Sequence, residues 1–336
     1  MASRRPTVLD VAKVAAVSPS TVSRCLRGGG YVSEDVRRRV AEAVEFLHYE
    51  PNDIARSLRG DRTNSIGAVF PQIANPFFSR CVQKIELEAT RQGYSVILLT
   101  HQEDPERQSR QLAVLRRARI DGVILTAAPG TNMDALRREI ADIPIVALDR
   151  PLWHDADVIM LQHRRAAFQA TLHLLGHDLR HVACVTANPS VYSFKERIDG
   201  YTQAMQESGR QPTVIAAPDY NELEAKIRAA VLAKPAIDAV LTLSNMATVS
   251  ALKAVQSVAG KRRRPLALIG FDDVDLATLV QPSLTVMVQP TEQMAHDSVE
   301  LLFSRISNSG PPDVRRIQSE GILICRQSCG CLHARL

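Results

Sequence analysis

Several features that define other classes of protein are missing from this sequence of 336 residues. No apolar run approaches the roughly 20 residues that a membrane-spanning helix needs, so we expect no membrane partner. The start, MASRRPTVLDVAKVAAVS, has Asp10 and Lys13 within its apolar segment and no small-residue cleavage site, which is untypical of a signal peptide. The six cysteines are scattered except for the last three and form no recognisable disulfide framework. These absences favour a protein of the reducing cytoplasm.

Catalytic motifs are absent as well. The chain has no Ser-His-Asp order, phosphate-binding loop or HExxH, so we expect no enzyme, no catalytic residue and no cofactor. The tail CRQSCGCLH holds Cys325, Cys329, Cys331 and His333, but zinc sites usually pair C-x-x-C units at set spacing. We interpret these thiols as incidental and expect no metal site. The basic run KRRR at 261–264 could touch DNA, but a solvated loop is the simpler interpretation.

The sequence does have a basic segment at its N-terminus. Residues 1–62 contain 11 Lys and Arg against 8 Asp and Glu, which gives +3 of the chain's total of +5. A small basic head on a nearly neutral body is typical of a protein whose head binds a polyanion.

Three short helices are predicted in this head. Thr7 caps VLDVAKVAA, Ser18 and Pro19 start a second helix that stops at the glycines 28–30, and Ser33 caps SEDVRRRVAEAVEFLHY. A tight turn between the first two helices makes a helix-turn-helix, whose second helix enters the major groove of DNA. The alternative is a small three-helix domain with a polar surface helix.

The second helix has an unusual composition. Its start, SPSTVSR, is rich in Ser and Thr, which are poor helix formers. Their short hydroxyls can reach phosphate oxygens and base edges, and Arg24 can donate two hydrogen bonds to a guanine. The segment PNDIARSLRG at 51–60 predicts a helix too short to be stable alone, which could order in a groove with Leu58 wedged between base steps. A plain linker helix is the alternative there.

Beyond the polar linker DRTNS, short apolar runs alternate with amphipathic stretches. The runs SIGAVF, YSVILLT, DGVILTA, IPIVALD, HVACVTA, AVLTLS and PLALIGFDD predict buried parallel strands, with helices between them. This alternation predicts an α/β fold of doubly wound sheets, in which ligands bind at the carboxyl ends of the strands.

Polar and aromatic residues follow several of these strands. They offer acceptors, donors and flat faces for a polyhydroxylated ligand, although Asp and Asn at strand ends also cap helices or make turns. The residues at these positions are Asn75, Phe77, Phe78, Asp149, Arg150, Asn245, Asp272 and Asp273.

The segments TVLDVAKVAAVSPSTVSRCL, YVSEDVRRRVAEAVEFLHYEPN, ARSLRG and SIGAVF closely resemble the lactose-repressor (LacI/GalR) family of bacterial transcription regulators. The resemblance covers essentially the whole chain. It implies a helix-turn-helix domain at 1–50 and a hinge helix and linker at 51–63. It also implies an effector-binding core at 64–336, like periplasmic sugar-binding proteins, with three crossover strands. The N-subdomain would span about 64–161 and 291–322, and the C-subdomain about 162–290.

The resemblance assigns roles in DNA binding. Pro19, Ser20 and Arg24 match the base-reading positions, while Ala55 and Leu58 match the hinge residues that open the central base step. The expected phosphate or backbone contacts are Thr7, Ser18, Thr21, Ser23 and Asn52.

The resemblance also assigns effector contacts to Asp149, Arg197 in ERIDGY, Asp272 in GFDD, Gln289 and Tyr220, in addition to the strand-end residues. Where many members have Asn-Asp, this chain has the neutral pair Ser244-Asn245. Because Arg150 and Arg197 would face the cleft with one carboxylate fewer, an anionic sugar acid or sugar phosphate is a hypothesis beside a neutral sugar.

We therefore expect a sequence-specific DNA-binding repressor of a carbohydrate catabolic operon, with operator affinity controlled by a small sugar or sugar derivative. Two half-sites require at least a homodimer, and no leucine heptads for a tetramerising coiled coil are present. An activator, a non-sugar effector, and a sugar-binding transport protein are the alternatives.

Overall fold

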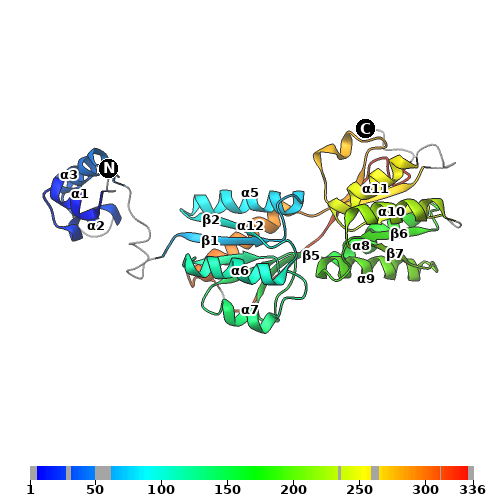
Figure 1. Ribbon diagram of the computed structural model, residues 1–336, viewed down its shortest axis with the longest axis horizontal. Coiled ribbons are helices and arrows are strands. Elements are labelled where there is room, and N and C mark those ends of the chain that lie inside the picture. Colours follow the sequence, from blue (N-terminus) through cyan, green and yellow to red (C-terminus); the bar gives the residue numbers. More distant parts are fainter. Residues whose placement is uncertain are drawn as a thin grey trace. The chain divides into compact units, whose positions relative to one another are not determined.

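The computed structural model (Figure 1) describes residues 6–27, 32–49, 62–233, 236–258, 265–310 and 312–331. The predicted hinge contacts Asn52, Ala55 and Leu58, the basic run at 261–264 and His333 lie outside these ranges. The chain divides into two compact units, Met1–Thr63 and Asn64–Leu336, which are described separately.

The first unit is a three-helix head with a small apolar core. Its helices are α1 (Val8–Val14), α2 (Pro19–Arg27) and α3 (Glu34–Phe46). Thr7 and Asp10 form a capping box at the start of α1, in which the backbone N–H and the hydroxyl of Thr7 both donate to the Asp10 carboxylate, at 2.8 and 2.6 Å. The residues buried between the helices are Val11, Ala12, Ala15, Val22, Val40 and Ala43. The predicted helix-turn-helix head is confirmed.

The second unit contains two six-stranded sheets, of which the first is parallel throughout. Its strand order is β11-β5-β4-β3-β1-β2. The bounds are β1 (Ser65–Phe70), β2 (Ser95–Thr100), β3 (Gly122–Leu125), β4 (Ile145–Leu148), β5 (Asp157–Leu161) and β11 (Arg316–Ser319). One face packs on α5 (Pro76–Arg91) and α12 (Thr291–Ile306), the other on α6 (Pro105–Arg117) and α7 (Met133–Glu139). The inner strands β1, β3, β4 and β5 are buried on both faces, which explains why they are apolar runs rather than alternating patterns.

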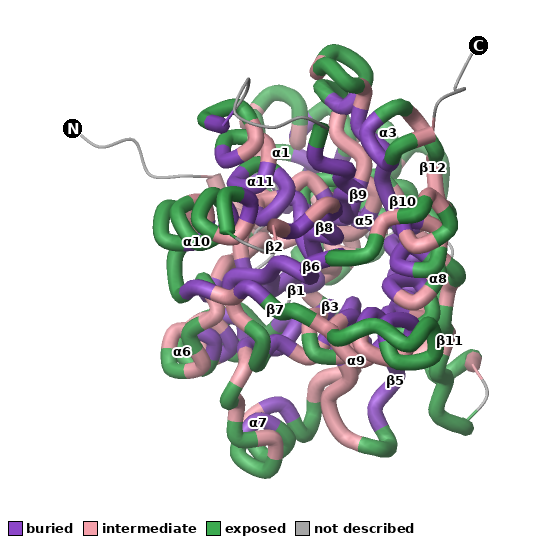
Figure 2. Tube along the Cα trace, turned by 90° about the vertical axis from the view of Figure 1, so that its right-hand side faces the viewer, coloured by how far each residue is buried: buried purple, intermediate pink, exposed green. Residues whose placement is uncertain are grey.

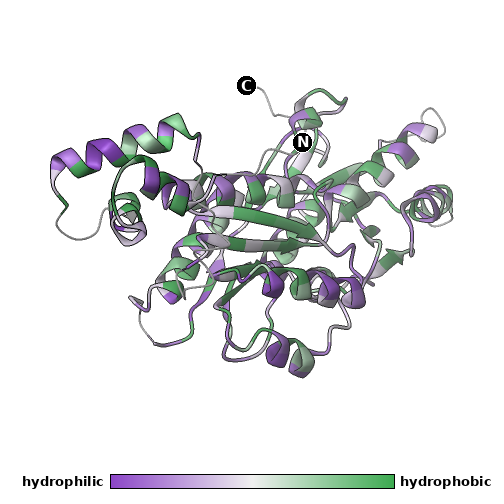
Figure 3. Cartoon of the chain, turned by 60° about the vertical axis from the view of Figure 1, so that its left-hand side comes forward, coloured by the Kyte–Doolittle hydropathy of each residue, from purple (hydrophilic) through white to green (hydrophobic). Residues whose placement is uncertain are grey.

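The second sheet has the order β12-β10-β9-β8-β6-β7, and only β12 pairs antiparallel. The strands are β6 (Val182–Thr186), β7 (Thr213–Ala216), β8 (Ala239–Thr242), β9 (Ala267–Phe271), β10 (Thr285–Val288) and β12 (Ile322–Ile324). Helices α8 (His163–Leu175) and α9 (Tyr192–Glu207) cover one face. Helices α10 (Tyr220–Leu232) and α11 (Asn245–Ser257) cover the other, beside the short helix η1 (Asp275–Thr278). Figure 2 shows β6, β8 and β9 buried, and Figure 3 shows the central strands as hydrophobic.

The chain passes between the two sheets at 161–163, 288–291 and 319–322, because β5, β10 and β11 are each followed by an element of the other half. The doubly wound α/β fold with two subdomains is therefore confirmed. The apolar runs did not identify β5, β7, β10, β11 or β12, which lie near the sheet edges or crossovers. No helix in the described part of the chain is long and apolar enough to cross a bilayer.

Helices α8 and α9 approach each other closely, and Gly200 makes this possible. A Cβ atom built on Gly200 would lie 2.0 Å from the carbonyl oxygen of Arg164 and 2.8 Å from its carbonyl carbon. These are backbone atoms, so a clash can be relieved only by moving one helix away from the other.

We therefore predict that Gly200→Ala destabilises the core by about 1–3 kcal/mol, because the strain of overpacking exceeds the gain in helix propensity. Gly176→Ala is the matched control, since its added Cβ would meet backbone oxygens only at 3.4 and 3.5 Å. Thermal unfolding measures both. Equal melting temperatures for the two variants would contradict the close approach at Gly200.

Candidate functional site

The head presents one polar face of α2. Ser18, Pro19, Ser20 and Arg24 are exposed, whereas Val22 on the opposite side is fully buried. Thr7, Thr21 and Ser23 are half-buried. The alternation follows from helical spacing, since Val22 points into the core and the residues two positions away on either side point out. All of the predicted base-reading residues therefore lie on the accessible surface.

The hydroxyls at the start of α2 form a small network. The Ser18 Oγ lies 2.7 Å from the Ser20 Oγ and 2.8 Å from the Thr21 Oγ1, and it accepts the Thr21 N–H at 3.1 Å. These bonds are exposed, so phosphate oxygens can replace them at little cost. Arg24 makes no hydrogen bond or ion pair with any described residue. Its guanidinium is thus available to a partner.

The core contains a cavity of about 390 Å³ lined by residues from both sheets and their helices. Nine of the eleven residues predicted to contact the effector line it: Asn75, Phe77, Phe78, Asp149, Arg150, Arg197, Tyr220, Asp272 and Gln289. Asp273 does not and pairs with Arg326 instead. Asn245 does not either: it is the first residue of α11, while Ser244, the N-cap of that helix, lines the cavity.

Asp149 and Asp272 occupy equivalent positions in the two halves of the core. Each follows directly after a strand, β4 or β9, and each has a left-handed backbone, with φ of 69° and 66°. Each also donates its N–H at 2.9 Å to the adjoining strand, to the carbonyls of Ile159 and Met287 respectively. Left-handed backbone is unfavourable for Asp and concentrates at functional sites. The two halves thus present one carboxylate each to the same cavity.

A buried hydrogen-bonded chain connects Arg197 to Asp149 through His163. The Nε and Nη2 of Arg197 lie 3.3 and 3.2 Å from the His163 Nδ1, and the His163 Nε2 lies 3.0 Å from the Asp149 carbonyl oxygen. Because Arg197 can only donate, Nδ1 is the acceptor and Nε2 carries the proton. Arg197 Nη1 also donates to the Leu243 carbonyl at 2.6 Å, and its guanidinium stacks 3.7 Å from the Phe271 ring centre.

Burial is the main influence on the pKa values of His163 and Asp272. Burial, and then the nearby Arg197, lowers the pKa of His163 to about 4, so the imidazole is neutral at physiological pH. Burial raises the pKa of Asp272, although Arg197 and a hydrogen bond from Gln289 oppose this shift. Gln289 Nε2 donates to Asp272 Oδ1 at 2.7 Å. His163 was not identified from the sequence, because no motif marks a histidine that acts behind the cavity wall.

Arg150 is held by a carboxylate that the sequence did not reveal. Glu103 binds its guanidinium with both oxygens, at 2.6 and 2.7 Å, and the Ala127 carbonyl accepts at 2.8 Å. Gln102 and Glu103 both have left-handed backbone, with φ of 54° and 61°, in the loop after β2. In the described part of the chain, the buried Nε of Arg150 and Oε1 of Gln289 have no hydrogen-bond partner. Both residues line the cavity.

A helix-turn-helix head joined to a two-sheet core with a polar cavity defines a ligand-responsive DNA-binding regulator. The chain belongs to the lacI family of bacterial regulatory proteins. The model of this family matches residues 7–52, and the model of periplasmic binding proteins and the sugar binding domain of the LacI family matches residues 63–326. The chain is therefore a transcription regulator under effector control and not an enzyme.

Known proteins of similar sequence or fold are consistent with membership of this family. A ribose operon repressor from Halalkalibacterium halodurans is 32% identical over 323 residues, which cover 96% of each chain. The transcriptional regulator CelR–cellobiose complex is 26% identical, with a TM-score of 0.71 over 96% of this chain and 100% of the other. The lac repressor dimer bound to operator and the anti-inducer ONPF is 22% identical and shares the fold, with a TM-score of 0.85 over 97% of this chain and 99% of the other.

The lowered pKa of His163 predicts a pH dependence of stability. Below pH 6.5 the unfolded chain takes up a proton that the folded chain binds only near pH 4, so stability falls as the pH falls through this window. From pH 7 to pH 5, wild type should lose about 2 kcal/mol more than His163→Gln. Urea unfolding at both pH values measures this difference.

The exposed His154 is the matched control, since its side chain is 88% accessible. His154→Gln should keep the wild-type pH dependence. A His163→Gln curve parallel to wild type would mean that His163 titrates normally in the fold.

Proposed function

We propose that this regulator is a repressor whose effector is a neutral sugar bound between Asp149 and Asp272. It acts as a homodimer in the cytoplasm, where each head reads one operator half-site. The observation that carries the proposal is the charge balance of the cavity, which favours a neutral sugar over an anionic one.

The cavity offers three carboxylates, Glu103, Asp149 and Asp272, against the two guanidiniums of Arg150 and Arg197. Glu103 neutralises Arg150 through two short hydrogen bonds. Arg197 is held by His163 and the Leu243 carbonyl. Three carboxylates against two guanidiniums leave the described lining with one formal negative charge in excess, which disfavours a phosphate or carboxylate ligand. A sugar hydroxyl, by contrast, donates readily to Asp149 and Asp272.

Two aromatic side chains in the cavity also suit a sugar ligand. Phe77 lies in the first turn of α5 in the first half, and Tyr220 is the first residue of α10 in the second half. Both side chains line the cavity. Sugar rings present apolar C–H faces that pack on such rings, while their hydroxyls bind the polar groups around them. The similarity to a ribose operon repressor makes D-ribose the first sugar to test.

Binding of one ligand by both halves provides the route to control. A sugar that bonds Asp149 and Asp272 together favours one closure of the two subdomains and shifts a two-state equilibrium. Reciprocity then requires that operator DNA change sugar affinity by the same factor as sugar changes operator affinity.

We predict that Asp149→Asn and Asp272→Asn each weaken D-ribose binding about 10- to 100-fold, because each loses a charge-assisted hydrogen bond. Calorimetry with D-ribose, ribose 5-phosphate and cellobiose measures the affinities. Asp273→Asn is the matched control, because Asp273 binds Arg326 and does not line the cavity.

Tighter binding of ribose 5-phosphate than of D-ribose would contradict the neutral effector. Wild-type ribose affinity in both carboxylate variants would place the sugar outside this cavity. If cellobiose binds and its binding depends on both carboxylates, the proposed site is correct and the effector is cellobiose rather than D-ribose.

For the head, we predict that Arg24→Ala costs about 1–3 kcal/mol per half-site and relaxes base preference at one position. The operator is first selected from random-sequence DNA, and binding is then measured on it and on a scrambled duplex. Arg38→Ala is the matched control, because Arg38 is an exposed arginine of α3 that pairs with Asp35. An equal loss on both duplexes for Arg24→Ala would make Arg24 a phosphate anchor.

A further inference from the structure

The segment after β12 packs against the second sheet and is tightly held there. Arg326 binds the Asp273 carboxylate with two hydrogen bonds of 3.0 and 2.8 Å. Ser328 accepts the Thr285 N–H at 2.8 Å and donates to the Leu268 carbonyl at 2.6 Å. The cysteines that follow are therefore fixed in position by their neighbours.

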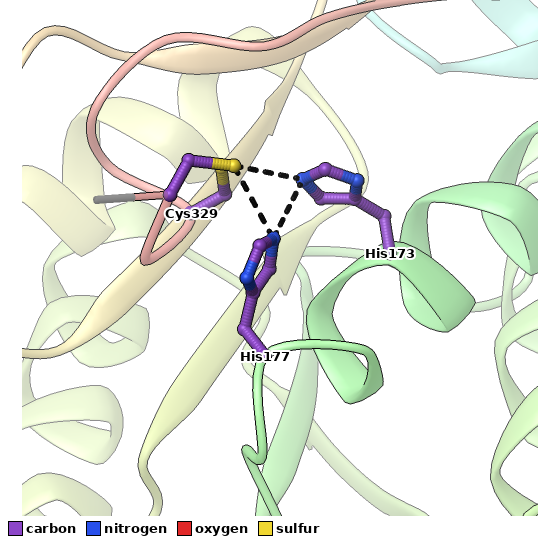
Figure 4. Close-up of side chains that lie close together, drawn as sticks. His173, His177 and Cys329 are labelled. Carbon is purple, nitrogen blue, oxygen red and sulfur yellow. Dashed lines mark hydrogen bonds between the residues drawn. The ribbon is translucent and has the colours of Figure 1, made fainter. Parts of the chain in front are cut away.

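These cysteines meet two histidines from a distant part of the chain. His173 lies in the last turn of α8 and His177 one turn further on, a spacing that puts both imidazoles on the same side. Figure 4 shows the two rings and Cys329 facing one another. The potential ligand atoms of His173, His177, Cys329 and Cys331 all lie within 4.8 Å of one another.

Four of the six distances between the potential ligand atoms are close to the edges of a tetrahedron, and two of these are slightly shorter. Cys331 Sγ lies 3.2 Å from His177 Nε2 and 3.7 Å from His173 Nε2, and the two imidazole Nε2 atoms are 3.4 Å apart. The sulfurs of Cys329 and Cys331 are 3.2 Å apart, and both are free thiols. A tetrahedral ion with bonds of about 2.0–2.3 Å has ligand atoms roughly 3.3–3.8 Å apart.

Gly330 allows the two cysteines to converge. Its φ is 94°, in a region that side-chain-bearing residues rarely adopt, and an added Cβ would contact His177 at 3.7 Å. This turn brings the sulfurs on either side of Gly330 toward the same pair of imidazoles. A Cys-Gly-Cys unit and a His-x-x-x-His unit thus form one cluster.

We propose that His173, His177, Cys329 and Cys331 bind a zinc ion. Two thiolates and two imidazoles are the ligand set of structural zinc sites, and hard cations such as Mg²⁺ or Ca²⁺ prefer oxygen. The spacing within the tail alone gave no reason to expect this site, because two of its four ligands are His173 in α8 and His177 just beyond the end of this helix.

The zinc ion joins the tail to the C-terminal end of α8. The same helix begins at His163, which contacts Arg197 and Asp149 behind the effector cavity. Metal binding therefore stabilises the second sheet and its tail and holds the far end of the helix that supports the cavity. The ion has no vacant position for catalysis once four protein ligands are bound.

The test uses the full chain, prepared metal-free under reducing conditions and titrated with Co²⁺ and then Zn²⁺. We expect one Co²⁺ per chain, with the intense visible bands of tetrahedral coordination and thiolate-to-metal charge transfer, displaced by Zn²⁺. Zinc should also raise the melting temperature. His177→Ala and Cys331→Ser should each weaken Zn²⁺ binding by more than about 100-fold.

Cys325→Ser is the matched control. Cys325 is exposed and lies 3.6 Å from the His173 Nε2, but it is outside the four-residue set, so this variant should keep the cobalt spectrum. A wild-type chain that binds no Co²⁺, or gives only the weak bands of octahedral coordination, would overturn the proposal. So would loss of binding in Cys325→Ser with binding kept in Cys331→Ser. Circular dichroism of each variant shows that it is folded.

Discussion

The hydrogen bonds from Arg197 through the neutral His163 to Asp149 join the two halves of the core and hold these two cavity-lining residues from behind the cavity wall. His163 begins α8 immediately after β5 of the first sheet, and Arg197 lies on α9 beside the second. A charged imidazole here would face a guanidinium in a buried setting, so burial keeps it neutral. Its single acceptor nitrogen then orients Arg197, and its single donor supports the backbone of Asp149.

Because the Arg197 guanidinium is held by His163 and the Leu243 carbonyl and Arg150 pairs with Glu103, the two remaining carboxylates carry the proposed recognition of a sugar. The carboxylates of Asp149 and Asp272 come from equivalent strained turns, one in each half. This near-symmetry means that a ligand small enough to fill the cavity contacts both halves at once. Under the proposed function, such a ligand favours one closure of the two halves and so controls operator affinity.

Local sequence patterns predicted much of the fold and several residues of the candidate site, but not all of them. Thr7 and Ser18 cap their helices as expected, and parallel strands with residues at their carboxyl ends brought Asp149, Asp272 and Asn75 into one cavity. Asn245 is the first residue of α11 and does not line the cavity, whereas its neighbour Ser244, the N-cap of that helix, does. Glu103 and His163 were missed because a carboxylate in a loop and a histidine after a strand have no distinctive spacing.

The sequence by itself determined what depends on neighbours along the chain: the helix caps, the apolar face of α2 inside the head, and the alternation of strands and helices. These depend on hydrogen bonds and side-chain periodicity over a few residues. Only the tertiary structure decided which charged side chains pair with each other and which potential metal-binding side chains lie together. Arg150 pairs with Glu103 across 47 residues, and Cys331 reaches His177 across 154. Such contacts are set by how the sheets pack and where the tail crosses, and no local pattern encodes that.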